Sequence, residues 1–236
     1  MTKENAMKGT LYGVGIGSGN PELLTYQAVK CIKSCDVIAI PNSGRGASVA
    51  YDIVIQALPE LSEKQMLQID MPMTKEKEIL KRYHENGGNL LLQYLKQGDV
   101  AFLTLGDPSI YATYMYLHDF VLKKGGQAHM ICGIPSFCSV ASALNISLAK
   151  GDEMLHIIPA SYPMEHALSL PGTKILMKAG KSFSKIKKML LTQRESIDCY
   201  MVENCGMKTE KKYFSPEEMP EEAGYFTTIV VKEKRN

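Results

Sequence analysis

The chain has 236 residues, of which 45% are apolar and 22% are charged, and its formal net charge is only +2. This is the composition of a globular protein with one large or two small domains, and the small charge disfavours a protein that binds nucleic acid through bulk charge. No apolar run approaches the ~20 residues that span a bilayer, and the N-terminus lacks the apolar core of a signal peptide, so we expect a cytoplasmic protein that does not enter a membrane.

Short apolar runs alternate with helix-like segments through the first half of the chain. The runs predict strands at residues 11–16, 37–40, 66–69, 100–105 and 128–132, and the segments between them predict helices at residues 21–34, 47–58, 75–97 and 109–124. The third segment is expected to form either one long helix or two helices separated at Gly87-Gly88. This alternation is typical of a parallel sheet with helices on both faces.

After Gly133 the predicted strands follow one another more closely. They lie at residues 154–158, 174–177, 199–203, 211–214 and 226–232, with a short helix at 136–144 before them and one clear helix at 184–192 between them. Closely spaced strands favour a mixed or antiparallel sheet. We therefore expect two α/β domains, residues 1–135 with a parallel sheet and residues 136–236 with a mixed sheet.

Cysteine and histidine spacing gives no support to a metal site. The six cysteines include no Cys-x-x-Cys pair, and the five histidines include no His-x-x-x-His pair. Several cysteines fall inside apolar patterns, where a free thiol behaves as a small hydrophobic side chain. We predict no bound metal.

A glycine-rich stretch, GVGIGSGNPELLT, follows the first predicted strand. The dinucleotide fingerprint Gly-x-Gly-x-x-Gly fails, because Ser18 or Asn20 occupies its last position in the two possible registers. A phosphate-binding Walker loop also fails, because the only Gly-Lys-Ser, at residues 180–182, has Ile175 where the first glycine is required. The stretch is consistent with a tight turn that has no ligand, or with a loop whose backbone approaches one.

Two later stretches repeat the pattern of strand, small residues and helix. FLTLGDPSIYAT contains Gly106-Asp107-Pro108, and CGIPSFCSVASALNIS begins at Cys132. In a parallel sheet these loops and the first one share the carboxyl edge, where open α/β sheets bind ligands. Together they predict a pocket with many backbone donors and few charges.

These elements resemble those of the tetrapyrrole methylase family, which transfers methyl groups from S-adenosylmethionine to corrin precursors. The family's first loop, Gly-x-Gly-Pro-Gly-Asp/Asn followed by Leu-Leu-Thr, corresponds to residues 15–20 and 23–25, and its Gly-Asp-Pro and Pro-Gly-x-Ser segments correspond to residues 106–108 and 132–136. KILMKAG, MVENCG and TTIVV match later elements, so the resemblance covers nearly the whole chain. Ser18 and Cys132 stand where the family has proline.

The resemblance implies a homodimeric enzyme with S-adenosylmethionine bound between its two domains. By that pattern the residues around the cofactor are Ser18, Leu105, Gly106, Asp107, Ile110, Pro135, Ser136, Met177, Lys178, Cys205, Gly206 and Thr228. We expect Asp107 to orient a polar end of the cofactor, to cap a helix that starts at Ser109, or to do both. No catalytic side chain and no general base is assigned, because the donor is already activated and the enzyme mainly aligns it.

Within the family the likeness is strongest to the members that methylate carbon 20 of the ring, through PNSGRGAS, LGDPSIYAT and LMKAG. The implied substrate is a tetrapyrrole, either cobalt-factor II or the metal-free precorrin-2, of which we favour the cobalt form. Arg45 and Ser48 are expected to hold a ring carboxylate and Tyr111 to stack on the ring, although a solvated arginine and a packed tyrosine fit the pattern too. A methylase acting at another ring carbon, a non-catalytic binding protein and a nucleotide-binding module are the alternatives.

Overall fold

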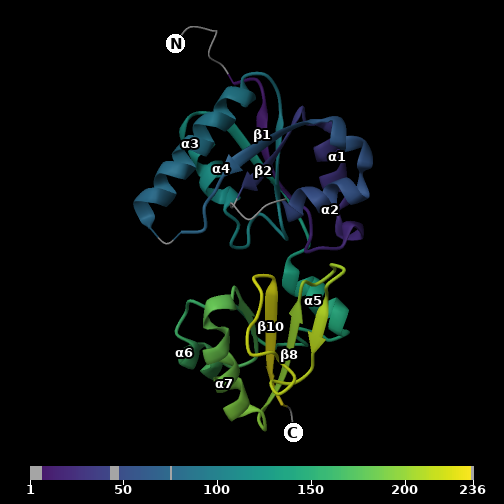
Figure 1. The fold of residues 1–236 in the computed structure, drawn as a ribbon, viewed down its shortest axis with the longest axis vertical. Coiled ribbons are helices and arrows are strands. Elements are labelled where there is room, and N and C mark those ends of the chain that lie inside the picture. Colours follow the sequence, from purple (N-terminus) through teal and green to yellow (C-terminus); the bar gives the residue numbers. More distant parts are fainter. Residues whose placement is uncertain (1–6, 43–47, 75, 235–236) are drawn as a thin grey trace. The chain divides into compact units, whose positions relative to one another are not determined.

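The computed structural model describes residues 7–42, 48–74 and 76–234, apart from the side chain of Lys181. The chain forms two compact units, Met1–Pro135 and Ser136–Asn236, and each is described here by itself (Figure 1). Each unit holds one five-stranded sheet, parallel in the first and mixed in the second. The predicted α/β fold class is confirmed.

The first unit is built on a parallel sheet in the order β3-β2-β4-β1-β5. Its strands are β1 (Thr10–Gly15), β2 (Val37–Asn42), β3 (Gln65–Asp70), β4 (Val100–Thr104) and β5 (Gln127–Ile131). Because all neighbours are parallel, the five carboxyl ends share one edge of the sheet. The central strand β4 is buried along its whole length, as a sheet covered on both faces requires.

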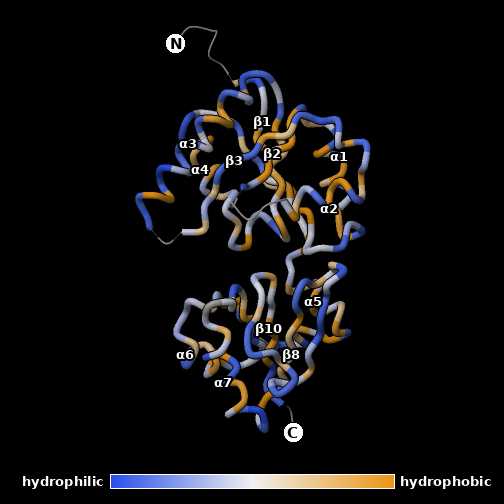
Figure 2. Tube along the Cα trace, viewed as in Figure 1, coloured by the Kyte–Doolittle hydropathy of each residue, from blue (hydrophilic) through white to orange (hydrophobic). Residues whose placement is uncertain are grey.

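Helices cover both faces of this sheet, and they enclose two separate apolar cores. The helices of the unit are α1 (Tyr26–Ser34), α2 (Val49–Ala57), α3 (Lys77–Leu95) and α4 (Tyr114–Lys123), with short 3-10 helices at Pro21–Leu23 (η2) and Pro59–Glu63 (η3). Ile32 and Ile53 pack with Ile38 in one core, while Leu91 and Leu117 join the other. Figure 2 shows the apolar residues, in orange, along β2 and on the neighbouring α1.

Three helix boundaries differ from the sequence expectation, and side-chain capping sets two of them. Residues 21–34 are not one helix: Asn20 caps the 3-10 helix, and Thr25 then accepts a hydrogen bond from Ala28 N at 3.1 Å to begin α1. Ser48 similarly caps α2, so that helix begins at Val49. Helix α4 begins at Tyr114, not near Ser109, so residues 105–113 form a long irregular loop.

Of the two alternatives for residues 75–97, the structure shows the single helix, because α3 runs unbroken through Gly87 and Gly88. Both are buried, and the reason for them is close packing. A Cβ atom on Gly88 would lie 2.2 Å from Phe120 Cδ1 of α4, and one on Gly87 would lie 2.6 Å from Ile69 Cγ2 of β3. The glycines therefore let α3 approach its neighbours and do not end the helix.

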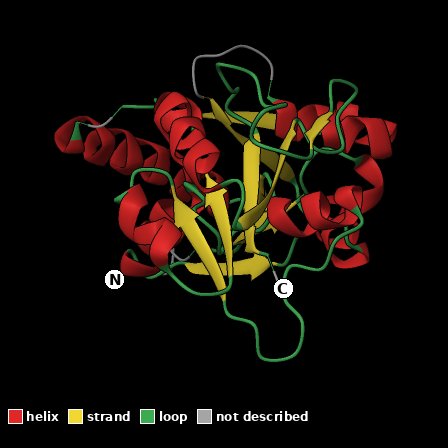
Figure 3. Ribbon diagram, turned by 90° about the horizontal axis from the view of Figure 1, so that it is seen from below, coloured by secondary structure: helices red, strands yellow, loops and turns green. Residues whose placement is uncertain are grey.

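The second unit contains a mixed sheet in the order β6-β7-β10-β8-β9. Its strands are β6 (Leu155–Pro159), β7 (Thr173–Met177), β8 (Ile197–Glu203), β9 (Lys211–Tyr213) and β10 (Thr227–Glu233), and its helices are α5 (Ser136–Leu144), α6 (Met164–Ser169), η4 (Gly180–Ser182) and α7 (Phe183–Gln193). Only β6 and β7 pair in parallel. Helices are red and strands yellow in Figure 3.

Sequence reasoning missed α6, which connects the parallel strands β6 and β7. A parallel pair of strands needs a crossover connection. The helix in this connection has only six residues and begins directly after Pro163. Met164 and Leu168 of α6 pack with Phe183 of α7 into the core of the unit. A helix this short shows too few periods for its pattern to be recognised.

Candidate active site

The three small-residue loops of the first unit lie together at the carboxyl edge of its sheet. They follow β1, β4 and β5, which are adjacent in the sheet. The first two loops are joined by two backbone hydrogen bonds, from Gly17 N to Gly106 O at 3.3 Å and from Gly106 N to Gly17 O at 2.7 Å. Stretches about 90 residues apart in the sequence therefore form one backbone surface.

Glycines bring the backbones of all three loops into contact. A Cβ atom on Gly15 would lie 2.6 Å from Gly133 N, and one on Gly133 would lie 2.1 Å from Gly106 O. Gly106 also has φ of 70°, which favours glycine. Any side chain at these contacts would push one loop away from another, so the residue type is set by space.

Asp107 links the second loop to the third through both of its carboxylate oxygens. Oδ1 accepts hydrogen bonds from Ser109 N at 2.8 Å and from Ser109 Oγ, and Oδ2 accepts one from Gly133 N at 2.9 Å. Asp107 is only 9% exposed to solvent. Burial by itself raises the pKa of Asp107, but the hydrogen bonds from Ser109 and Gly133 outweigh it and hold that pKa below its usual range.

The engagement of Asp107 corrects one expected role. It does not cap a helix starting at Ser109, because α4 begins five residues later. Its local bond to Ser109 N forms a tight turn within the loop instead. The carboxylate therefore organises the loops from inside the first unit.

Thr25 joins the third loop to the start of α1. Its Oγ1 donates to Cys132 O at 3.3 Å while accepting from Ala28 N. Cys132 itself is exposed, and its hydrogen bond with Asp107 is the main reason that the pKa of its thiol is raised. Cys132, which stands where the resemblance expects proline, therefore takes part in the contact between loops through its backbone carbonyl.

Ser18 supplies an unsatisfied polar group in the first loop. Its Oγ is buried and has no hydrogen-bond partner among the described residues. A buried hydroxyl without a partner costs about 1–3 kcal/mol, so such a group is a candidate for a ligand contact. Together with the glycine contacts, this hydroxyl makes the loops suited to a polar, largely backbone-bound cofactor.

The Ser18 hydroxyl gives a prediction with opposite signs for stability and binding. Ser18→Ala should raise the free energy of unfolding without ligand by about 1 kcal/mol, because a desolvated hydroxyl is removed. It should also weaken S-adenosylmethionine binding by about tenfold, because the ligand loses a hydrogen bond. Urea unfolding and titration calorimetry measure the two effects.

Ser139→Ala is the matched control, because Ser139 Oγ in α5 is also buried, with no hydrogen-bond partner in the part of the chain that the structure describes, but is not among the predicted cofactor residues. It should give a similar gain in stability and leave the affinity unchanged. Equal affinities for wild-type protein and Ser18→Ala would remove Ser18 from the cofactor site.

The other predicted residues of the first unit fall at or near the same edge. Leu105 and Ile110 are half-buried in the second loop, and Tyr111 is 44% exposed with φ of 51°. A positive φ is uncommon for an aromatic residue and marks a constrained loop. Ser48 lies at the first turn of α2, and Arg45 lies outside the described residues.

The predicted residues that follow residue 176 gather at one end of the second sheet. Met177 ends β7 and is the cross-strand partner of Thr228, near the start of β10. Cys205 and Gly206 follow the end of β8, which pairs with the same part of β10. Lys178 comes directly after β7 with φ of 59°. Ser136 is the first residue of α5, and Pro135 is the last residue of the first unit.

Two glutamates that the sequence reasoning missed hold this end of the second sheet in place. Glu203 accepts hydrogen bonds from Tyr213 Oη at 3.1 Å and from Gly224 N at 2.9 Å. Glu210 accepts one from Gly206 N at 2.7 Å. Burial opposes ionisation of Glu210, but the Gly206 N–H and the Lys212 ammonium lower its pKa. The MVENCG match was the only sequence signal for Glu203, and Glu210 lies after that motif and had none.

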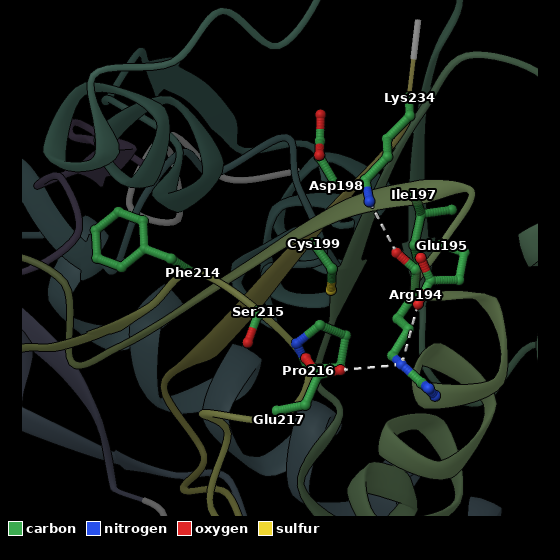
Figure 4. A pocket seen from close by; sticks show the side chains of 10 residues that line it. All are labelled: Arg194, Glu195, Ile197, Asp198, Cys199, Phe214, Ser215, Pro216, Glu217 and Lys234. Atoms are coloured by element: carbon green, nitrogen blue, oxygen red, sulfur yellow. Dashed lines mark hydrogen bonds and ion pairs between the residues drawn. The ribbon is translucent and has the colours of Figure 1, made fainter. Parts of the chain in front are cut away.

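A hollow of about 290 Å³ in the second unit is not part of this arrangement (Figure 4). The hollow lies at the start of β8, where Ile197 and Cys199 line it. The predicted cofactor residues Cys205 and Gly206 instead follow the other end of β8, which is Glu203. Arg194 pairs there with Glu217 at 3.4 Å. None of the predicted cofactor residues lines the hollow, and its charged lining consists of two cations and three carboxylates.

Two further classes of feature were searched for in residues 7–42, 48–74 and 76–234. These residues contain no group of three or more His, Cys, Asp or Glu side chains placed to hold a metal ion. Among the helices of the same ranges, none combines the length and the apolar character that crossing a bilayer requires.

Comparisons with known proteins agree with this architecture. Residues 10–220 match the family model described as Tetrapyrrole (Corrin/Porphyrin) Methylases. A relative from Methanocaldococcus jannaschii, named "Probable cobalt-precorrin-2 C(20)-methyltransferase", is 33% identical over 88% of this chain and 87% of its own length. A relative from Sinorhizobium sp, named "Precorrin-2 C(20)-methyltransferase", is 30% identical over 94% of this chain and 95% of its own.

Solved structures share the fold. The uroporphyrin-III C-methyl transferase from Thermus thermophilus, complexed with S-adenyl homocysteine, has a TM-score of 0.68 at 20% identity, covering 95% of this chain and 97% of its own. At that level of identity the likeness shows the fold alone.

Proposed function

Because this chain belongs to the tetrapyrrole (corrin/porphyrin) methylase family, whose members transfer methyl groups from S-adenosylmethionine, we propose that it methylates carbon 20 of cobalt-factor II (cobalt-precorrin-2) in cobalamin biosynthesis. The observation that carries the choice of carbon and substrate is the relative of 33% identity and nearly equal coverage that bears the name of this activity. The alternative substrate is metal-free precorrin-2, which the name of the 30% identical relative supports. A family member acting at another ring carbon is the remaining alternative.

The residues present fit the cofactor. Bound S-adenosylmethionine supplies a methyl group already activated by its sulfonium, so the protein needs alignment and exclusion of water more than acid or base catalysis. The joined loops offer Gly106, the unsatisfied Ser18 hydroxyl and the flanking apolar residues Leu105 and Ile110. In this proposal Asp107 stabilises the loops through its hydrogen bonds with Ser109 and Gly133.

We also propose that both units contribute to the cofactor site. The residues expected to join the first-unit loops are Pro135, Ser136, Met177, Lys178, Cys205, Gly206 and Thr228. Their support is that five of them gather at one end of the second sheet. Apart from Lys178 this group is uncharged, as suits a site that excludes water around a methyl donor.

On the substrate side, Arg45, Ser48 and Tyr111 remain the proposed contacts. Replacing Arg45 with Ala should weaken tetrapyrrole binding by about tenfold and leave the affinity for S-adenosylmethionine unchanged, because a charge-assisted hydrogen bond to a ring carboxylate is lost. Fluorescence titration with the ring and calorimetry with the cofactor measure the two affinities. Equal loss of both would assign Arg45 to the stability of the loop instead.

The deciding experiment is a methylation assay under anaerobic conditions. The enzyme is incubated with methyl-labelled S-adenosylmethionine and either cobalt-factor II or metal-free precorrin-2, and the new methyl group is located by NMR. Label at carbon 20 of the cobalt compound is the expected result. Preference for precorrin-2 would select the alternative substrate, and no label in either ring would reject the proposal.

The cytoplasmic location and the homodimer expected from the sequence stay predictions. Sedimentation equilibrium of the purified chain tests the dimer, and cell fractionation tests the location. A monomer that is fully active would show that the site needs no second copy.

A further inference from the structure

The proposed reaction leaves one chemical task without a residue. Carbon 20 is a meso carbon, and before methylation it carries one hydrogen. After the methyl group bonds to it, the carbon holds both substituents and the ring carries a positive charge. Conjugation returns only when the C–H bond breaks, its electron pair enters the ring and the hydrogen leaves as a proton. A basic group placed near the ring would accept that proton.

A carboxylate at the carboxyl edge of the first sheet is suited to this task. Asp70 is the last residue of β3, and its side chain is exposed. Its cross-strand partner is Asn42, the last residue of β2. Asn42 Nδ2 donates to Asp70 Oδ1 at 2.8 Å, which orients the carboxylate and leaves Oδ2 without a hydrogen bond from the described residues.

The register places Asp70 along the same edge as the cofactor loops. Strands β2 and β4 are neighbours that pair in parallel as far as Ala39 and Phe102, so Asn42 and Leu105 both lie three residues beyond this last pair, toward the carboxyl edge. Asp70 is one strand beyond Asn42. Two strand spacings amount to about 10 Å, a distance that a tetrapyrrole ring can bridge.

The face of the sheet agrees with this placement. Leu67 and Ile69 of β3 face the core that contains α3 and α4, so the alternation of a strand puts Asp70 on the opposite face, with α2. That is the side on which Ser48 begins α2, where a substrate carboxylate is proposed to bind. Asp107, the carboxylate within the second loop, already accepts three hydrogen bonds within its unit.

We propose that Asp70, oriented by Asn42, is the general base that removes the proton from the methylated meso carbon. This assignment rests on the proposed function. The proton passes to Asp70 Oδ2, and the electron pair of the broken C–H bond restores the conjugated ring. No oxidant or further reactant is required. The positive ring makes this hydrogen acidic, so a carboxylate is a strong enough base.

The test measures turnover of Asp70→Asn with substrate carrying hydrogen or deuterium at carbon 20. General-base removal should lower kcat by about 100-fold. Proton removal should then limit the rate, so an isotope effect of about 2 or more on kcat should appear that is smaller in the wild-type enzyme. The affinity for S-adenosylmethionine should not change, because the cofactor loops are intact.

Two further variants complete the experiment. Asp70→Glu keeps the carboxylate and should recover part of kcat, and it also serves if Asp70→Asn does not fold. Asp119→Asn, an exposed aspartate of α4, is the matched control and should behave as wild type.

Each outcome decides the assignment. Unchanged kcat in Asp70→Asn, or a loss of kcat without the isotope effect, would overturn the role as base. A wild-type enzyme that methylates no tetrapyrrole would instead reject the proposed function, and the assignment of Asp70 with it.

Discussion

Replacing Gly133 with Ala should lower the free energy of unfolding of the first unit by about 3 kcal/mol and weaken S-adenosylmethionine binding at least tenfold. The added methyl group would lie 2.1 Å from Gly106 O and 2.7 Å from Gly15 Cα, and both neighbours are backbone atoms that no rotamer change can move. Overpacking of this kind typically costs about 1–3 kcal/mol, and the absence of a flexible neighbour puts Gly133 at the upper end.

The Gly133 variant separates space from backbone conformation. Gly133 is not among the residues with positive φ, so alanine meets no dihedral penalty there and the whole effect comes from the contact between loops. Gly180→Ala is the matched control, because the nearest atom to its Cβ would be Ala223 O at 4.0 Å. Chemical unfolding and calorimetry with the cofactor measure both quantities. A Gly133→Ala protein with wild-type stability would show that the loops do not need to touch.

Asp107→Asn should destabilise the first unit by about 2–3 kcal/mol at neutral pH and also weaken cofactor binding. The substitution removes the charge that accepts from Ser109 and Gly133, and an amide cannot accept at both of its ends. Hydrogen bonds to a charged group contribute about 1.5–3 kcal/mol each, and the buried Gly133 N–H would lose its acceptor. Ser109→Ala removes only the hydroxyl donor and should lower the free energy of unfolding by about 1 kcal/mol, which is less than the loss expected for Asp107→Asn.

The pH dependence of the Asp107 effect follows from its lowered pKa. A carboxyl whose pKa is lower in the folded state than in the unfolded state stabilises the fold above the unfolded value, which is about 3.9. That contribution falls as the pH drops below about 4 and is lost as the pH passes through the folded pKa. The difference in unfolding free energy between wild-type protein and Asp107→Asn should therefore be constant from pH 5 to 8 and shrink below pH 4. A difference independent of pH across this range would falsify the role of the ionised carboxylate.

In the second unit a family motif located cofactor-site candidates but did not identify the residues that hydrogen-bond to the turns around them. MVENCG identified Cys205 and Gly206, but it gave no reason for Glu203 or Glu210 to hold the neighbouring turns. Those hydrogen bonds join residues that only the turn after β8 and the connection before β10 bring together. The sequence motif therefore located Cys205 and Gly206 but did not reveal the glutamates that hold the neighbouring turns.

The sequence by itself determined the strands, the two sheet types and the loops that carry small residues. Buried apolar runs such as VIAI and VAFLT are local signals, and a parallel sheet covered on both faces requires them. The order of strand and helix then implied that the three loops share one edge. These features depend on residues that are close in the sequence, so they can be predicted before the tertiary structure is known.

Only the tertiary structure decided what individual residues at that edge do. Gly88 left open whether residues 75–97 form one helix or two, and the structure shows that it allows Phe120 to approach; Asp107, expected to contact the cofactor, to cap a helix or to do both, links two loops. Asp70 carried no signal at all until the register placed it beside Asn42. In each case the partner lies 26 residues or more away in the sequence, and contacts at that separation exist only once the sheet and its helices have packed.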